Sequence, residues 1–171
     1  MPTTPLFGLR YPAPTDPADV PQDIHNLASD TETLASYLTK TYVPTWGSDG
    51  TAPVLGNGTL TGSYIQVGKL VLATTKLTIG STSTLGTGTY YMSLPVQSAI
   101  WVFGTGKITD VSLGVASPVT PETQTATLMR ALTHLSGAVG STATHGVVTA
   151  SGPIPWASGD LIELTIAYFA A

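Results

Sequence analysis

The stretch that decides the fold runs from Pro44 to Tyr64 and reads PTWGSDGTAPVLGNGTLTGSY. Before it lie a proline-rich segment and one heptad pattern. After it, threonine, glycine and β-forming residues dominate and charge is almost absent. Period-two alternation between glycine and proline clusters is typical of an antiparallel sandwich or barrel-like domain. We therefore predict a mainly β protein with an extended N-terminal arm (1–18), one short helix (19–41) and a jelly-roll-like β-sandwich (42–171).

The composition argues against several classes of partner and site, namely nucleic acids, membranes, disulfides and thiolate metal sites. Charged residues make up 9% of the chain, hydrophobic residues 42%, and the net charge is −4, so we expect a packed core rather than disorder. The six cations are scattered, which argues against a nucleic-acid partner. The lack of cysteine excludes disulfides and thiolate metal sites. Apolar runs are too short to span a membrane, and we expect neither a secretion signal nor a membrane partner.

The N-terminal arm combines prolines with apolar side chains. Five prolines lie between Pro2 and Pro17, and proline fixes φ and donates no backbone hydrogen bond, which favours an extended segment. The interleaved apolar residues are Leu6, Phe7, Leu9 and Tyr11. A mere spacer would not need them. They are expected either to cover the chain's own β-domain or to dock into a neighbouring subunit, and the pattern favours neither.

The helix is predicted from its cap and its heptad spacing. Asp19 is a good N-cap, and Pro21 suits the first turn, where no amide donor is required. Apolar residues then recur at spacings of four and three, with one threonine among them. This seam comprises Val20, Ile24, Leu27, Thr31, Leu34 and Leu38. Its narrow width favours a trimeric coiled coil supported by the following domain over a single amphipathic helix lying on the sheet.

Strand faces can be assigned by alternation. Two strands should each present one apolar face, formed by Val71, Ala73, Thr75, Leu77 and Ile79 in the first and by Ile162, Leu164, Ile166 and Tyr168 in the second. Residues 99–103 suit a short buried strand, followed by a hairpin turn at 104–106 that leads into residues 107–110. A long strand over 123–135 is expected to carry Leu128, Arg130, Leu132 and His134 on one face. Residues 136–155 should form a surface loop around a short strand at 146–149.

Catalytic and metal-binding patterns are missing. The carboxylates Asp49, Asp110, Glu122, Asp160 and Glu163 show no evident pair for glycoside hydrolysis, and Glu163 should face outward. The histidines His25, His134 and His145 lack the spacing of metal ligands on one face. We therefore predict no enzyme, no cofactor and no metal site.

The aromatic residues allow two interpretations. Trp46, Trp101, Trp156 and the pair Tyr90–Tyr91 could form a sugar-binding platform, because their rings stack on apolar sugar faces. The favoured alternative is that Trp46 and Trp156 each cap the core of the β-domain beside a turn.

Several segments together resemble structural proteins of tailed bacteriophages: 5–12 (PLFGLRYP), 14–17 (PTDP), 44–64, 86–95 (GTGTYYMSLP) and 155–160 (PWASGD). The resemblance implies a non-enzymatic protein on the virion surface, assembled in the host cytoplasm. The function we expect is capsid decoration as a head-fibre protein that binds and stabilises the assembled capsid. The alternative is a tail-tip or tail-fibre protein that binds host-surface glycans. The expected partners are two further copies in a homotrimer and the major capsid protein or another virion protein, with the arm as the capsid anchor.

Overall fold

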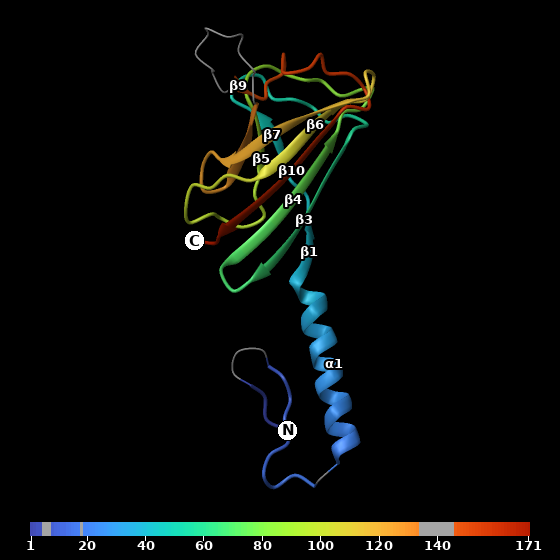
Figure 1. Cartoon of the computed structure of the whole chain (residues 1–171), viewed down its shortest axis with the longest axis vertical. Helices are drawn as coiled ribbons and strands as arrows, with labels where there is room; N and C mark the ends of the chain where they lie inside the picture. The colour runs from blue at the N-terminus through green and yellow to red at the C-terminus, as the bar shows by residue number, and fades with distance from the viewer. Residues whose placement is uncertain (5–7, 18, 134–145) are drawn as a thin grey trace. The chain divides into compact units, whose positions relative to one another are not determined.

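The computed structural model describes residues 1–4, 8–17, 19–133 and 146–171. These form two compact units, Met1–Lys40 and Thr41–Ala171, which are treated separately below. Figure 1 shows the helix α1 and the twisted sheet. The elements are α1 (Val20–Leu38), β1 (Thr39–Tyr42), β2 (Trp46–Ser48), β3 (Thr59–Val67), β4 (Leu70–Thr78), β5 (Tyr90–Ser93), β6 (Thr105–Asp110), β7 (Val115–Thr123), β8 (Leu128–Thr133), β9 (Gly146–Val147) and β10 (Leu161–Phe169).

The ten strands belong to one sheet, in which nine follow the order β1-β3-β4-β10-β6-β7-β8-β5-β2 and β9 pairs with β8. The pairs whose register is resolved are all antiparallel. β5 and β9 lie end to end along the same side of β8. The mainly β class is therefore confirmed. The structure does not have the two packed sheets of the predicted sandwich. It has a single sheet that curls into a half-barrel.

The curl has a direct cause in the chain. β1 and β2 form opposite edges of the sheet, yet only Val43–Thr45 connects them, so the two edges must lie close together. The Tyr42 hydroxyl donates to the Ser93 carbonyl oxygen at 3.4 Å, across the opening between the edges. The Ser93 amide donates to the Thr45 carbonyl at 3.1 Å. Because the sheet nearly closes on itself, one inner face can hold the core without a second sheet.

The core occupies that inner face. The alternation predicted for residues 71–79 and 161–169 is confirmed, and the two strands are in direct register, with Leu77 opposite Ile162 and Val71 opposite Tyr168. The Tyr168 hydroxyl donates to the Val96 carbonyl at 2.8 Å, which satisfies the one polar group on this side chain. The buried apolar residues are Val71, Ala73, Leu77, Ile79, Tyr90, Met92, Leu94, Ile108, Val119, Met129, Ala131, Val148, Ile162, Leu164, Ile166, Tyr168 and Ala170.

The LGNG segment at 55–58 forms a tight junction that leads into β3. Gly56 has φ +57°, and a side chain there would collide with the backbone of Thr82. The Asn57 carboxamide oxygen accepts from the Thr82 amide at 2.9 Å, while its nitrogen donates to the Ser81 hydroxyl at 3.0 Å. These contacts join the loop before β3 to the turn that follows β4. The LGNG motif therefore has a structural role, which is to hold these two loops together.

The prediction for residues 99–106 was wrong. Ile100, Trp101 and Phe103 are 50%, 71% and 66% exposed rather than buried. Gly104 does not lie in a hairpin turn: its amide bonds the Pro121 carbonyl at 2.8 Å, and a Cβ there would clash with the Thr165 carbonyl oxygen. Here the glycine permits close passage of the backbone along β10, with β6 beginning at the next residue.

The predicted long strand over 123–135 is divided between β7 and β8, while Leu128, Arg130 and Leu132 share one face of β8 as predicted. In β8 the buried residues are Met129, Ala131 and Thr133, while Leu128, Arg130 and Leu132 are only partly buried. His134 lies outside the described residues, as does 136–145 of the expected loop. The short strand expected at 146–149 is present as β9. Both faces of β8 carry apolar residues, so alternation alone could not identify the inner one.

Candidate functional site

The helix α1 carries the heptad seam. The Asp19 carboxylate accepts from the Gln22 amide at 3.1 Å and Pro21 lies in the first turn, which confirms the predicted helix start. Val20 and Ile24 are each 63% exposed and Leu27 is 47% exposed, so within one chain this part of the seam is uncovered. Thr31 is also exposed, and its hydroxyl donates to the Leu27 carbonyl at 2.8 Å. The side chains of Leu34 and Leu38 lie outside what the structure describes.

The arm is not simply extended. It doubles back, because Thr3 and Arg10 form an isolated antiparallel bridge. The Tyr11 amide donates to the Pro2 carbonyl at 3.0 Å, and the Thr4 amide donates to the Leu9 carbonyl at 2.9 Å. The expectation of an extended arm needs this correction: prolines exclude a regular ladder, yet the non-proline residues between them still pair. Leu6 and Phe7 lie outside the described residues.

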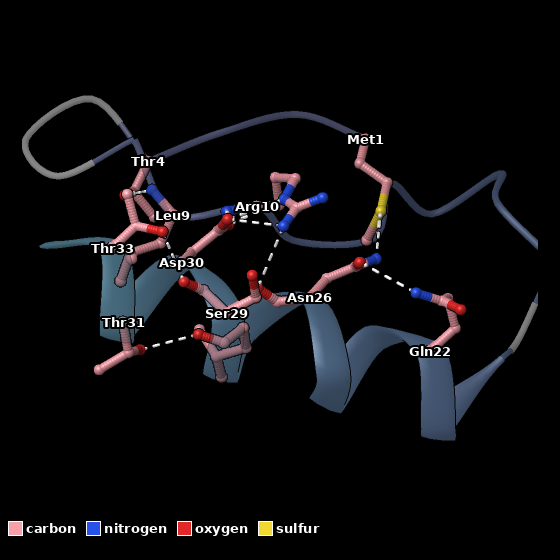
Figure 2. Close-up of polar contacts among 11 residues, drawn as sticks. Met1, Thr4, Leu9, Arg10, Gln22, Asn26, Ser29, Asp30, Thr31 and Thr33 are labelled. Atoms are coloured by element: carbon pink, nitrogen blue, oxygen red, sulfur yellow. Dashed lines mark hydrogen bonds and ion pairs between the residues drawn. The ribbon is translucent and has the colours of Figure 1, made fainter.

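Arg10 attaches the arm to the helix (Figure 2). Its Nη2 donates to Asp30 Oδ1 at 2.7 Å and its Nε donates to Asp30 Oδ2 at 2.9 Å. The Arg10 backbone amide adds a bond to Oδ2 at 2.8 Å, and Nη2 also donates to the Asn26 carbonyl at 3.3 Å. Two parallel N–H···O bonds match the planar guanidinium to the carboxylate. The side-chain and backbone bonds from Arg10 lower the pKa of Asp30.

Between the arm and the helix lies a groove of about 320 Å³, which we call the arm–helix groove. Its walls combine arm residues with the first three members of the seam. The lining residues are Thr4, Leu9, Arg10, Tyr11, Pro12, Val20, Asp23, Ile24 and Leu27. The structure therefore places two of the four predicted arm residues, Leu9 and Tyr11, beside Val20, Ile24 and Leu27 of the predicted seam.

A second hollow, of about 500 Å³, lies in the β unit, where β3, β4 and β10 run side by side. Hydroxyl groups of Thr and Ser dominate its lining, with Lys76 and Glu163 as charged members. Glu163 faces outward as predicted and pairs with Lys107 at 2.9 Å and Lys76 at 3.4 Å. The bond from Lys107 is the main cause that lowers the pKa of Glu163. These lysines are about half exposed, so the two ion pairs contribute little to the stability of the fold.

The aromatic residues do not form one platform. Trp46 and Trp156 pack against the core, as the capping interpretation predicted, and both contact Tyr90, with ring centroids 5.1 and 6.1 Å from its centroid. Tyr90 is 3% exposed, its hydroxyl donates to the Leu85 carbonyl at 2.8 Å, and burial raises its pKa to about 12. Trp101, in contrast, is 71% exposed. A stacking site for a sugar would therefore have to use Trp101 without these three rings.

The acidic residues outside α1 are held in structural bonds. Asp160 is fully buried and accepts from the amides of Ala157 at 2.7 Å and Val111 at 3.0 Å. Asp110 accepts from the Ser112 hydroxyl at 2.7 Å and the Leu113 amide at 3.0 Å, and these bonds lower its pKa. Glu122 accepts from Arg130 Nε at 2.6 Å. Each carboxylate thus positions a turn or a strand.

Among the described residues, no three histidine, cysteine or acidic side chains are grouped closely enough to hold a metal ion. His25 is exposed on α1, while His134 and His145 lie outside the described part. In that same part of the chain, no helix combines the length and apolarity needed to cross a membrane. The chain matches no family model, no curated protein and no solved structure with which it was compared.

Sequence reasoning missed the pairing of Arg10 with Asp30. The heptad pattern contained a signal for this pairing. If the seam residues occupy positions a and d of the heptad, Asp23 and Asp30 occupy position g, which lies next to the seam. Position e on the other side of the seam, in the heptads that follow, holds Ala28 and Ala35. A charged g position usually finds its partner at an e position of the adjoining helix. Because the helix offers no cation at position e, Arg10 in the arm was the candidate partner for Asp30.

Proposed function

We propose that this chain is a non-enzymatic structural protein of the outer surface of a tailed-phage particle, a trimeric capsid decoration or head-fibre protein that binds and stabilises the assembled capsid. The observation that carries the proposal is the uncovered seam on α1. A helix of 19 residues whose apolar stripe is more than half exposed at Val20 and Ile24 gains little from its own chain. Association with identical helices would bury that stripe.

The seam favours association of like with like. Spacings of four and three place the apolar residues on one narrow line, which is the pattern that meshes with a copy of itself. Burying a Val, Ile or Leu side chain is worth about 1.5–3 kcal/mol. Three copies of each residue therefore supply a substantial driving force. Helix α1 is followed in the chain by β1, so a trimer of helices would carry three β units.

The β unit suits a binding role without chemistry. Its acidic residues serve turns and strands, and its loops are locked by side-chain bonds such as those of Asn57. The resemblance of residues 5–17, 44–64, 86–95 and 155–160 to tailed-phage structural proteins supports a place on the virion. In this proposal the arm, through Leu6 and Phe7, contacts the major capsid protein, and three arms per trimer give avidity to weak individual contacts.

The alternative is a tail-tip or fibre protein that binds host-surface glycans. The observation that favours it is the hydroxyl-lined hollow on β3, β4 and β10, together with the exposed ring of Trp101. Hydroxyl, lysine and carboxylate groups offer the donors and acceptors that sugar hydroxyls need. Copy number separates the two functions, because decoration requires many copies per particle and receptor binding only a few.

The decisive experiment is a phage that lacks this chain, scored for particle stability and for adsorption. A decoration protein that binds only the assembled shell stabilises it by mass action. Mutant particles should therefore assemble and adsorb normally but release DNA at lower temperature or after osmotic shock. Particles with normal heat resistance and lost adsorption would overturn capsid decoration in favour of the glycan-binding alternative. Complementation with the chain carrying Leu6→Ala and Phe7→Ala should fail to restore occupancy if the arm is the anchor.

A further inference from the structure

We infer that the arm is part of the trimer interface: Leu9 and Tyr11 of one copy cover the helix of the next copy, so that the arm–helix groove receives a second copy of α1. This inference rests on the proposed trimer and adds to it a contact that the heptad pattern does not contain. Two observations carry it, namely the side of the helix on which the arm lies and the residues that the neighbouring helix would present there.

The arm lies along one flank of the seam. With about 100° of rotation per residue, Asp30 is displaced by roughly 80° from the centre of the seam. Arg10 holds the arm at this residue by its side chain and its amide, as Figure 2 shows. Leu9 and Tyr11 consequently share the groove with Ile24 and Leu27 rather than lying behind the helix. The apolar residues of the arm thus widen the apolar surface of the seam on the side where Asp30 lies.

The neighbouring helix presents small residues to that flank. In a parallel coiled coil the g position of one helix faces the e position of the next heptad on its neighbour. For Asp23 and Asp30 those positions are Ala28 and Ala35, both exposed in a single copy. An alanine has no charge to offer the g-position aspartates and leaves room beside itself. The arm supplies a cation for Asp30, through Arg10, and the apolar side chains of Leu9 and Tyr11.

The charge pattern supports a second copy as the occupant. Arg10 already neutralises Asp30 within its own chain, so this carboxylate needs no cation from the next helix. Tyr11 is 46% exposed in the single copy and is one of the residues that line the groove. A helix that carries the same seam, with alanine along its e flank, is complementary to this groove in shape and polarity.

The first test measures assembly of the full chain by analytical ultracentrifugation. The double variant Leu9→Ala/Tyr11→Ala should raise the protein concentration at half-assembly about tenfold or more, as expected for truncated interface side chains. Pro14→Ala is the matched control, because Pro14 is an exposed arm residue outside the groove lining. It should leave assembly unchanged. Circular dichroism of each variant should show the wild-type helix and strand content.

The second test uses the absence of cysteine in the chain. Tyr11→Cys protein and Ala28→Cys protein carrying a mass tag are dissociated, mixed and reassembled, and then oxidised. Disulfides joining the two different proteins should form in the mixture, and neither variant alone should cross-link efficiently. Residue 28 lies on the opposite flank of the seam from Asp30, so the link reports contact between copies.

The outcomes separate the inference from the proposal on which it rests. A wild-type chain that remains monomeric at micromolar concentration would overturn the trimer and the inference with it. A wild-type trimer whose assembly is indifferent to the Leu9→Ala/Tyr11→Ala change, with no mixed disulfide, would overturn the inference alone.

Discussion

Arg10 and Asp30, twenty residues apart in the chain, meet in a two-pronged ion pair whose shortest contact is 2.7 Å. Arg10 belongs to a proline-rich arm that the sequence suggested would be extended, and Asp30 belongs to the polar side of the heptad pattern. Their pairing converts two separate segments into one compact unit and places the arm beside the seam. Two of the predictions below follow from this unit, and two concern the β unit.

Charge placed in the seam should abolish association. Ile24→Asp/Leu27→Asp would bury two carboxylates per copy in any seam-mediated trimer, at a cost no partner group offsets. We expect monomers by light scattering at a concentration where the wild type is trimeric. His25→Asp is the matched control, since His25 is exposed on α1 and outside the seam. Loss of the trimer in the control as well would indicate a general charge effect and contradict the role of the seam.

The Arg10–Asp30 pair should respond to acid and not to base. The pKa of Asp30 in the folded state is lowered below its ordinary value of 3.8. The stabilisation of the folded state by this ion pair is therefore fully present above pH 3.8, and it is lost as the pH falls through the lower pKa of the folded state. An NMR titration of the Asp30 carboxyl carbon should give a midpoint below 3.8, and Arg10→Ala should return it toward 3.8.

Lys107→Ala serves as the control for this titration, because it removes one cation whose partner is Glu163. It should leave the Asp30 midpoint unchanged. An Asp30 midpoint at or above its ordinary value in the wild type would show that the ion pair does not form in solution.

Two isoleucines test which segments are inside the half-barrel. Ile108 on β6 is fully buried, while Ile100, in the run predicted to be a buried strand, is 50% exposed. Ile108→Ala should lower the free energy of unfolding by about 2–5 kcal/mol. Ile100→Ala should change it by about 0.5 kcal/mol or less. Urea denaturation of the full chain distinguishes them. Equal losses would restore the sequence-based assignment of 99–103 to the core.

Gly104 should not tolerate a side chain. A Cβ there would clash with the Thr165 carbonyl oxygen and approach Ile166 Cα to 3.0 Å, and both are backbone atoms that cannot rotate away. Gly104→Ala should therefore cost about 1–3 kcal/mol, as overpacking does. Thr105→Ala, at the adjacent exposed position, is the control and should be nearly neutral. A stable Gly104→Ala protein would mean that 104 lies in a turn, as the glycine spacing first suggested.

Local patterns in the sequence predicted the elements whose determinants are themselves local. The start of α1 follows from Asp19 and Pro21, whose capping and first-turn roles involve only neighbouring residues. The faces of β4 and β10 follow from alternation, because in each strand a charged residue, Lys76 or Glu163, marks the opposite face as the outer one. The heptad spacing likewise predicts an apolar stripe on α1, whose role as a seam between copies stays a prediction.

Only the tertiary structure decided how these elements combine. Alternation is the same in a sandwich and in a half-barrel, and the choice depends on the three residues Val43–Thr45 that bring the edge strands β1 and β2 together. The inner face of β8, the exposure of Trp101 and the pairing of Arg10 with Asp30 likewise depend on partners distant in sequence. The periodicity of a segment indicates its local geometry. The burial of each residue in that segment is determined by which distant segment packs against it.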